Sequence, residues 1–101
     1  MKLPMSDLPT LHYLFAECRK PCPERPDVTA IVLFALLCEN DDVVYLAIRY
    51  IDYANGLAQG DHLWLSLEDA KQGLFDEHGI TEDDWRALSA REIARIDRTI
   101  E

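Results

Sequence analysis

Cysteine and histidine side chains are the first candidates for chemistry in this chain. Three thiols are present, and the spacing Cys18-x3-Cys22 is not that of a CxxC pair, which leaves Cys38 as a third thiol. Histidines at 12, 62 and 78 would be needed to complete a metal site or to activate a thiol, yet no spacing relates them to the cysteines. We therefore interpret the thiols as buried or incidental and expect no metal and no cofactor.

Adjacent acidic residues offer a second possible chemistry, because paired carboxylates serve as general acid and base or bind Mg²⁺. The candidates are Asp41-Asp42, Asp52 and Glu82-Asp83-Asp84. Such acids also favour turns and complement the dipole of a helix that they begin, which is the interpretation we prefer. The sequence has no glycine-rich phosphate loop, no HExxH and no GxSxG. We therefore expect a protein that is not an enzyme.

The acidic charge is concentrated in the middle of the chain. The formal net charge is -9, with a net of -10 in residues 28–84, balance in residues 1–27 and +1 in residues 85–101. Nucleic-acid binding needs Lys and Arg to neutralise phosphates, so this charge argues against it and favours a basic protein partner. A purely solubilising role for the acids is the alternative.

Length and composition predict one soluble domain. A chain of 101 residues with 49% hydrophobic content fits a single domain over residues 1–101. The odd number of cysteines and a start, MKLPMSDLP, without an apolar secretory segment favour the cytoplasm. The longest apolar run, Ala30 to Cys38, has about half the length that a bilayer-spanning helix needs, so we assign it to the core and expect no membrane association.

The first half of the chain predicts a helix followed by a β-hairpin. The helix would begin at Ser6 or Asp7 and end before Pro21, because its apolar residues share one helical face. Two apolar runs from Val28 to Tyr53 then flank a turn at residues 40–42, and their β-branched and aromatic residues favour strands. Two hydrophobic helices, with Asp41 or Asp42 as N-cap, are the alternative. The apolar residues of the first helix are Leu8, Leu11, Leu14, Phe15 and Cys18.

The C-terminal part predicts a short strand and then helices. After a loop marked by Asn55-Gly56 and Gly60-Asp61, residues 62–65 form a third strand, and Gly79 ends the helix that follows it. Gly73 inside that helix indicates close packing on the sheet. Capping boxes pair Ser66 with Asp69, Thr81 with Asp84 and Ser89 with Glu92. The predicted fold is α+β: an N-terminal helix, a small three-stranded antiparallel sheet, and two or three C-terminal helices packed on it.

The run LWLSLEDAKQGLFDEHGITEDDW, Leu63 to Trp85, resembles a pattern found in small bacterial toxin-immunity proteins, including those of contact-dependent inhibition systems. The shared pattern is a strand, an S-L-E-E-A helix, G-I and D-W, and it covers about a quarter of the chain. The resemblance implies a cytoplasmic protein that binds and blocks a cognate toxin, often a nuclease with a basic cleft. It implies no catalytic residues.

We expect the partner-binding surface to combine acids, which speed encounter, with aromatic anchors, which slow dissociation. Trp85 has a second interpretation, as a core residue between the last two helices. Two other functions remain open: a small enzyme or ligand-binding domain with a pocket between sheet and C-terminal helices, and a self-associating regulatory or scaffold subunit using the apolar strands as its interface. The residues expected to bind the partner are Asp41, Asp42, Asp52, Tyr53, Asp61, Glu82, Asp83, Asp84 and Trp85.

Overall fold

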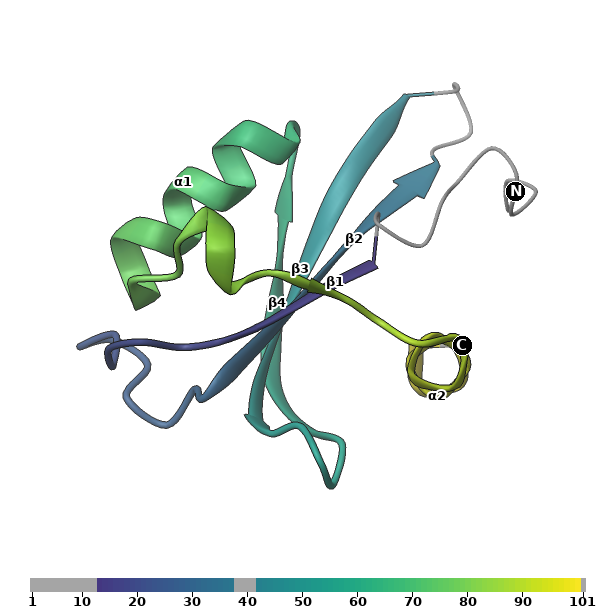
Figure 1. Cartoon of the computed structure of the whole chain (residues 1–101), viewed down its shortest axis with the longest axis horizontal. Coiled ribbons are helices and arrows are strands. Elements are labelled where there is room, and N and C mark those ends of the chain that lie inside the picture. The colour runs from purple at the N-terminus through teal and green to yellow at the C-terminus, as the bar shows by residue number, and fades with distance from the viewer. Residues whose placement is uncertain (1–12, 38–41, 101) are drawn as a thin grey trace.

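The computed structural model describes residues 13–37 and 42–100, which form an α+β fold built on one antiparallel sheet (Figure 1). The sheet has five strands in the order β4-β3-β2-β1-β5. Two α-helices and a short 3₁₀ helix, η2, follow the fourth strand. The elements are β1 (Tyr13–Glu17), β2 (Ala30–Leu37), β3 (Val43–Asp52), β4 (Leu57–Trp64), α1 (Leu67–His78), η2 (Glu82–Asp84), β5 (Arg86–Ala87) and α2 (Ala90–Ile100).

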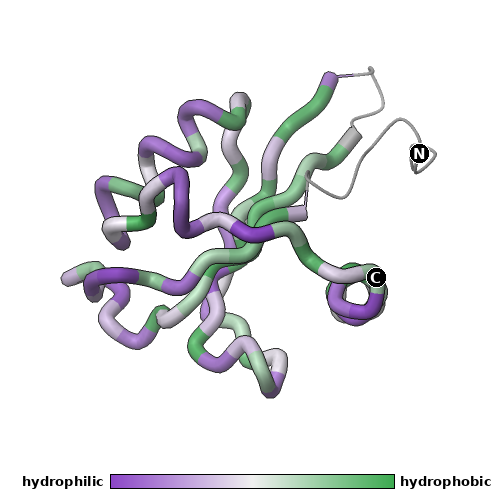
Figure 2. The backbone as a smooth tube through the Cα atoms, in the orientation of Figure 1, coloured by the Kyte–Doolittle hydropathy of each residue, from purple (hydrophilic) through white to green (hydrophobic). Residues whose placement is uncertain are grey.

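The predicted hairpin is confirmed as β2 and β3, and the helical alternative for these residues is wrong. Strand β2 lies at the centre of the sheet, between β1 and β3, and is apolar along its length, as Figure 2 shows. Its residues Ile31 to Phe34 are at most 1% exposed. A strand with apolar side chains on both faces needs cover on both faces, and the two helices provide it.

Helices α1 and α2 cover opposite faces of the sheet (Figure 1). Alternation along β2 sends Val32 and Phe34 to the cluster that contains Ile93 and Ile96 of α2. The side chains that alternate with them, Ile31 and Leu33, pack with Ala70 and Leu74 of α1. The sheet therefore separates two apolar clusters.

The predicted N-terminal helix is wrong where the structure describes it. Residues Tyr13–Glu17 form β1, which pairs with β2 and β5, and the expected helix start at Ser6 or Asp7 lies outside the described residues. Tyr13 and Phe15 join the cluster beneath α2, whereas Ala16 joins the one beneath α1. The ring of Tyr13 stacks on Phe34 with centroids 5.3 Å apart. Pairing along both edges of β1 thus overrides the helical spacing of its apolar residues.

The predicted three-stranded sheet is also wrong, because the sheet has five strands. The third predicted strand extends back to Leu57, so Gly60 and Asp61 lie within β4 rather than in a loop. The capping box of Thr81 and Asp84 is present but begins only η2, since Trp85 is extended at φ -77° and ψ 131°. Two residues, Arg86–Ala87, then pair with β1 as β5 before α2 begins.

Helix α1 matches its predicted boundaries. The Ser66 hydroxyl accepts a hydrogen bond from the N–H of Asp69 at 3.1 Å, and Gly79 ends the helix at φ 70°. The predicted close packing at Gly73 is confirmed, because a Cβ there would lie 2.7 Å from Cζ2 of Trp64 and closer still to Cη2. The ring of Trp64 on β4 thus packs directly on the backbone of α1.

We expect Gly73→Ala to destabilise the protein, although alanine in an open helical position would gain about 1 kcal/mol over glycine. The added methyl group must displace the Trp64 ring, at a cost of about 1–3 kcal/mol. Urea denaturation of Gly73→Ala in the wild-type and Trp64→Leu backgrounds measures the coupling. An equal effect of the alanine in both backgrounds would contradict the packing assigned to Trp64.

Candidate partner-binding surface

The predicted acids do not gather on one surface. Asp42 precedes β3 and Asp52 ends it, so roughly 30 Å of extended strand lies between them. Asp61 lies on the edge strand β4, and Glu82 and Asp83 lie in η2 on the α1 side of the sheet. Asp41 is outside the described residues. A compact partner surface therefore includes only part of the predicted set.

Asp52, Asp84 and Trp85, like Tyr53, are engaged within the fold. Asp84 accepts hydrogen bonds from the Arg19 guanidinium and from the N–H of Thr81 at 2.8 Å, and these bonds hold its pKa well below the usual range. Asp52 accepts a bond from the Asn55 side chain at 2.6 Å in the β3–β4 turn. Trp85 is partly buried against the α1 cluster, so it does pack on the core. Its expected place between the last two helices is wrong, because Trp85 is extended and α2 covers the opposite face.

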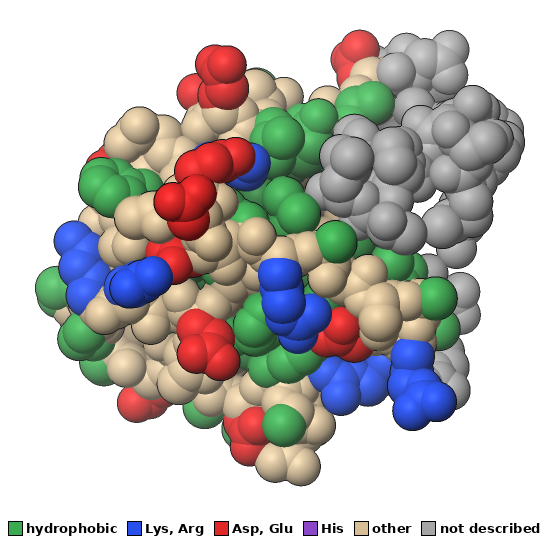
Figure 3. Space-filling view, viewed as in Figure 1, with side chains coloured by type: hydrophobic (Ala, Val, Ile, Leu, Met, Phe, Trp, Pro, Cys, Tyr) green, Lys and Arg blue, Asp and Glu red, His purple; other side chains and the backbone are tan. Residues whose placement is uncertain are grey.

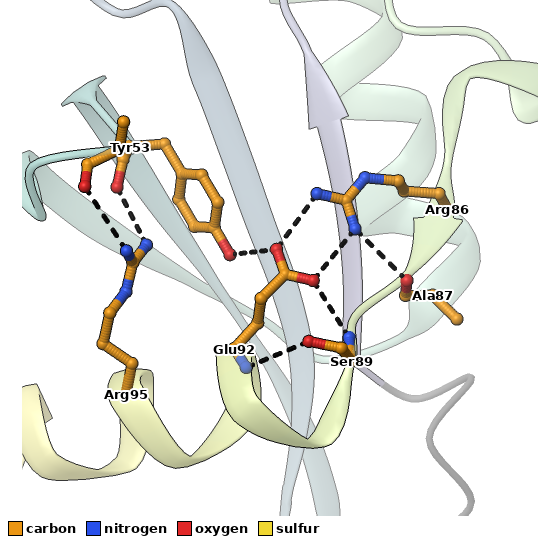
Figure 4. Close-up of polar contacts among 7 residues, drawn as sticks. Tyr53, Arg86, Ala87, Ser89, Glu92 and Arg95 are labelled. Atoms are coloured by element: carbon orange, nitrogen blue, oxygen red, sulfur yellow. Dashed lines mark hydrogen bonds and ion pairs between the residues drawn. The ribbon is translucent and has the colours of Figure 1, made fainter.

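Tyr53 belongs to a polar network that attaches α2 to the sheet (Figure 4). Its hydroxyl donates to Glu92 at 2.7 Å, and its ring lies 4.6 Å from the Phe15 ring. Arg95 of α2 lies over the Tyr53 ring and donates to the Tyr53 carbonyl oxygen at 2.9 Å. Burial, and secondly the bond to Glu92, raises the pKa of Tyr53 to about 12. Tyr53 therefore holds α2 in place from beneath it.

Glu92 is the acceptor at the centre of this network. Arg86 donates to both of its carboxylate oxygens, at 3.1 and 3.0 Å, and the N–H of Ser89 donates at 3.0 Å (Figure 4). The Arg86 guanidinium also lies 4.6 Å from the centre of the Phe15 ring. The bonds from Arg86, then those from Ser89 and Tyr53, lower the pKa of Glu92 to about 2. The carboxylate thus joins α2 to β5 and to the end of β3.

Acidic and apolar side chains gather instead on the outer side of α1, on a surface that we call the acidic face. Figure 3 shows acidic side chains over α1 and η2, and arginines over β5 and α2. The apolar members are exposed, Leu65 to 79% and Phe75 to 49%. Lys71 pairs with one of the acids, Glu82, at 2.8 Å. The acidic face consists of Leu65, Glu68, Asp69, Phe75, Asp76, Glu82 and Asp83.

Two open hollows flank α1 within the acidic face. One, of about 490 Å³, lies between α1 and η2, and includes Phe75, Glu68 and Glu82 in its lining. The other, of about 480 Å³, lies between α1 and the end of β4, with Asp69 and Asp76 in its lining. Each hollow pairs carboxylates with an apolar wall, which suits a protein side chain better than a small polar substrate.

Helical spacing was the signal that could have located the acidic face. Ala70 and Leu74 are buried, so Glu68, Phe75 and Asp76 fall on the opposite side of α1. In the sequence, the first-turn acids of this helix were interpreted as capping signals, and Phe75 was not among the residues expected to bind a partner. Sequence reasoning identified Glu82 and Asp83 but missed the residues of α1 and Leu65.

A third hollow, of about 420 Å³, lies beside β1 but has no reactive group. It is lined by Phe15, Glu17, Cys18, Arg19, Asp84 and Arg86. Its two arginines bind Asp84 and Glu92. Burial, with a smaller contribution from Cys22, raises the pKa of Cys18 to about 11, so this residue is a thiol at neutral pH. In the described part of the chain, no three His, Cys, Asp or Glu side chains are placed to hold a metal ion.

His78, at the end of α1, is buried without a hydrogen bond. Its side chain is 0% exposed, and neither ring nitrogen has a hydrogen-bond partner among the described residues, although Nε2 lies 3.9 Å from Oε1 of Glu77. Burial lowers its pKa, as do the nearby cations Arg25, Arg49 and Lys20, while Glu77 opposes them. The His78 imidazole is therefore neutral in the folded protein at pH 7, and its protonation at lower pH favours unfolding.

We expect Glu92→Gln to lower the unfolding free energy by about 2 kcal/mol at pH 7, because charge-assisted bonds from Arg86 are lost. The pKa of Glu92 falls from 4.5 to about 2 on folding, so its contribution is complete above about pH 4.5 and disappears towards pH 2. Urea denaturation between pH 7 and 3 should show the variant and wild type converging. Glu82→Gln, at an exposed pair, is the control and should change stability by under about 0.5 kcal/mol.

We expect His78→Leu to remove part of the pH dependence of stability. The folded pKa of His78 is below its ordinary 6.5, so wild-type stability falls as pH decreases from 6.5, where only the unfolded state binds the proton. Thermal or urea unfolding between pH 7.5 and 5.5 measures this slope. If His78→Leu leaves the dependence of unfolding free energy on pH unchanged, burial does not lower the pKa of His78 as described.

Comparison with known proteins gives no match for this chain, whether with protein-family models, with curated proteins or with solved structures. Within the described residues, no helix is long and apolar enough to cross a membrane. Function is therefore inferred from the geometry and charge of the chain itself.

Proposed function

We propose that this protein is an immunity-type inhibitor, which binds a basic protein toxin through the acidic face and blocks it stoichiometrically. It acts in the cytoplasm, without a cofactor and without chemistry of its own. A nuclease is a suitable target, because a cleft that binds nucleic acid carries the positive charge that the acidic face complements.

The exposure of Phe75 and Leu65 among carboxylates is the observation that carries this proposal. Large apolar side chains at 49% and 79% exposure have no folding role that requires them to face solvent. At a protein interface, such side chains supply the desolvated contacts that slow dissociation, while surrounding charges speed encounter. A solubilising role accounts for the acids but leaves the two apolar side chains unexplained.

The distribution of charge also favours the α1 side as the surface that binds a basic protein. Acids of α1 and η2 lie on one side, and arginines of β5 and α2 lie towards the other (Figure 3). The cations Arg19, Lys20 and Lys71 also lie on the α1 side, where Arg19 and Lys71 are paired with Asp84 and Glu82. This separation orients an approaching basic protein towards α1 before contact. The net of -10 in residues 28–84 strengthens the long-range part of that attraction.

The other two functions draw less support from the described residues. The hollow beside β1 has paired charges and a protonated thiol, so it offers no activated group to a substrate. Side chains of β2 are buried in the sheet, so folding already accounts for the apolar run that suggested self-association.

The proposal predicts that Glu68→Gln, Asp69→Asn and Asp76→Asn together slow complex formation. The proposal expects the toxin to be the basic C-terminal domain of a secreted protein encoded immediately upstream of this gene, and that domain is the probe. Stopped-flow association at low ionic strength should slow by about tenfold, and its salt dependence should flatten, because the electrostatic attraction is reduced.

A matched control removes three exposed acids elsewhere, by Glu17→Gln, Glu24→Gln and Asp27→Asn. Both variants have the same net charge, so a slower rate in only the first assigns the effect to the acidic face. Equal slowing in both would contradict that assignment. If the wild-type chain neither binds this domain nor protects cells that express it, the proposed function is wrong.

A further inference from the structure

We infer that β4 is a strand-addition site, at which an extended cationic segment of the partner pairs with the sheet as a sixth strand. This inference rests on the proposed function and specifies how the partner docks. The inference assigns backbone hydrogen bonds with the partner to the edge of the sheet, whereas the acidic face contacts the partner through side chains.

Strand β4 is the long edge of the sheet. Among the described strands it pairs with β3 alone, whereas the opposite edge, β5, has two residues. Six of the eight residues of β4 are exposed, so in the described part of the chain this edge is not covered. An open edge strand presents a row of N–H and C=O groups that can pair with another extended chain.

The second half of β4 is a regular template for pairing. Irregularities in its register with β3 occur between Arg49 and Asp52, opposite the first half of β4. From Gly60 to Trp64 the register is continuous, with five consecutive pairs to β3. A partner strand of similar length can therefore pair there without a bulge.

Side chains around this template favour a cationic and partly apolar partner. Asp61 is the only acid on β4, and Asp69 and Asp76 line the hollow that begins at Leu63. Neither β4 nor that hollow contains a lysine or arginine. Leu63 is 52% exposed and provides an apolar contact beside Asp61 on the α2 face of the strand, whereas Asp69 and Asp76 lie on the α1 face.

Arg49 of β3 lies at the start of this template and offsets part of its acidity. It donates to the side-chain oxygen of Gln59 at 2.8 Å, and a Cβ at Gly60 would lie 3.1 Å from its guanidinium. Arg49 is therefore held against Gln59 and Gly60, next to Asp61, whose carboxylate interacts with it electrostatically. The carboxylates of Asp69 and Asp76 lie further along, around the hollow lined by Leu63 to Leu65.

A second copy of this chain is the less suitable occupant. Two copies that pair antiparallel about a twofold axis would place both Asp61 carboxylates on one ladder, and each copy has a net charge of -9. Like charges across a ladder oppose pairing, whereas lysine or arginine opposite Asp61 favours it. The charge of the edge thus selects a basic partner strand.

The test uses a capped heptapeptide in which lysine or arginine alternates with valine. Two control peptides have the same side chains but carry N-methyl groups on alternate amides, one in each register, which blocks one row of backbone hydrogen bonds. NMR hydrogen exchange of ¹⁵N-labelled protein reports the result. At a peptide concentration about tenfold above Kd, exchange of alternate amides within Gly60–Trp64 should slow by about tenfold with the unmodified peptide.

One N-methylated control should lose this protection, because only one row of peptide amides faces β4. Asp61→Lys should weaken binding of the unmodified peptide by about tenfold, whereas Asp27→Lys, at an exposed acid before β2, should weaken it much less. If all three peptides act alike, or if none slows exchange in β4, strand addition is wrong. The proposed function is decided separately, by binding of the toxin domain to the wild-type chain and to the acidic-face variant.

Discussion

Burial of β2 on both faces is the constraint on which the rest of the structure depends. Ile31 to Phe34 are at most 1% exposed, and burying each large side chain contributes about 1.5–3 kcal/mol. This contribution is available only if the sheet is covered on both sides, so α1 and α2 must lie on opposite faces. Because β1 and β3 lie beside β2, the strands at the two edges of the sheet are β4 and β5.

The two helices are attached to the sheet by different interactions, and this difference leaves the outside of α1 free. α1 packs through apolar contacts and through Gly73 against Trp64, so its outer acids are not needed for attachment. α2 combines buried isoleucines with a network in which Glu92 binds Arg86 and Tyr53. The α2 side is therefore a structural junction, whereas the α1 side can carry a binding surface.

Local signals in the sequence predicted the elements that local interactions determine. The hairpin of β2 and β3, the N-cap at Ser66 and the left-handed Gly79 depend on residues close in sequence, and all three were predicted correctly. β1 was mistaken for a helix because its apolar spacing fits either element, and only pairing with distant strands decides between them. The two residues of β5 show no periodicity at all. The exposure of Phe75 likewise depends on which side of α1 meets the sheet.

The acidic face and the edge of β4 form one continuous surface, because Leu63 to Leu65 line the same hollow as Asp69 and Asp76. A bound strand on β4 would therefore place every second side chain on the α1 face, beside the carboxylates of α1. The two parts of this surface respond differently to salt. Attraction by exposed carboxylates is screened beyond about 8–10 Å at physiological ionic strength, which affects encounter. Backbone hydrogen bonds form at contact, so they slow dissociation with little dependence on salt.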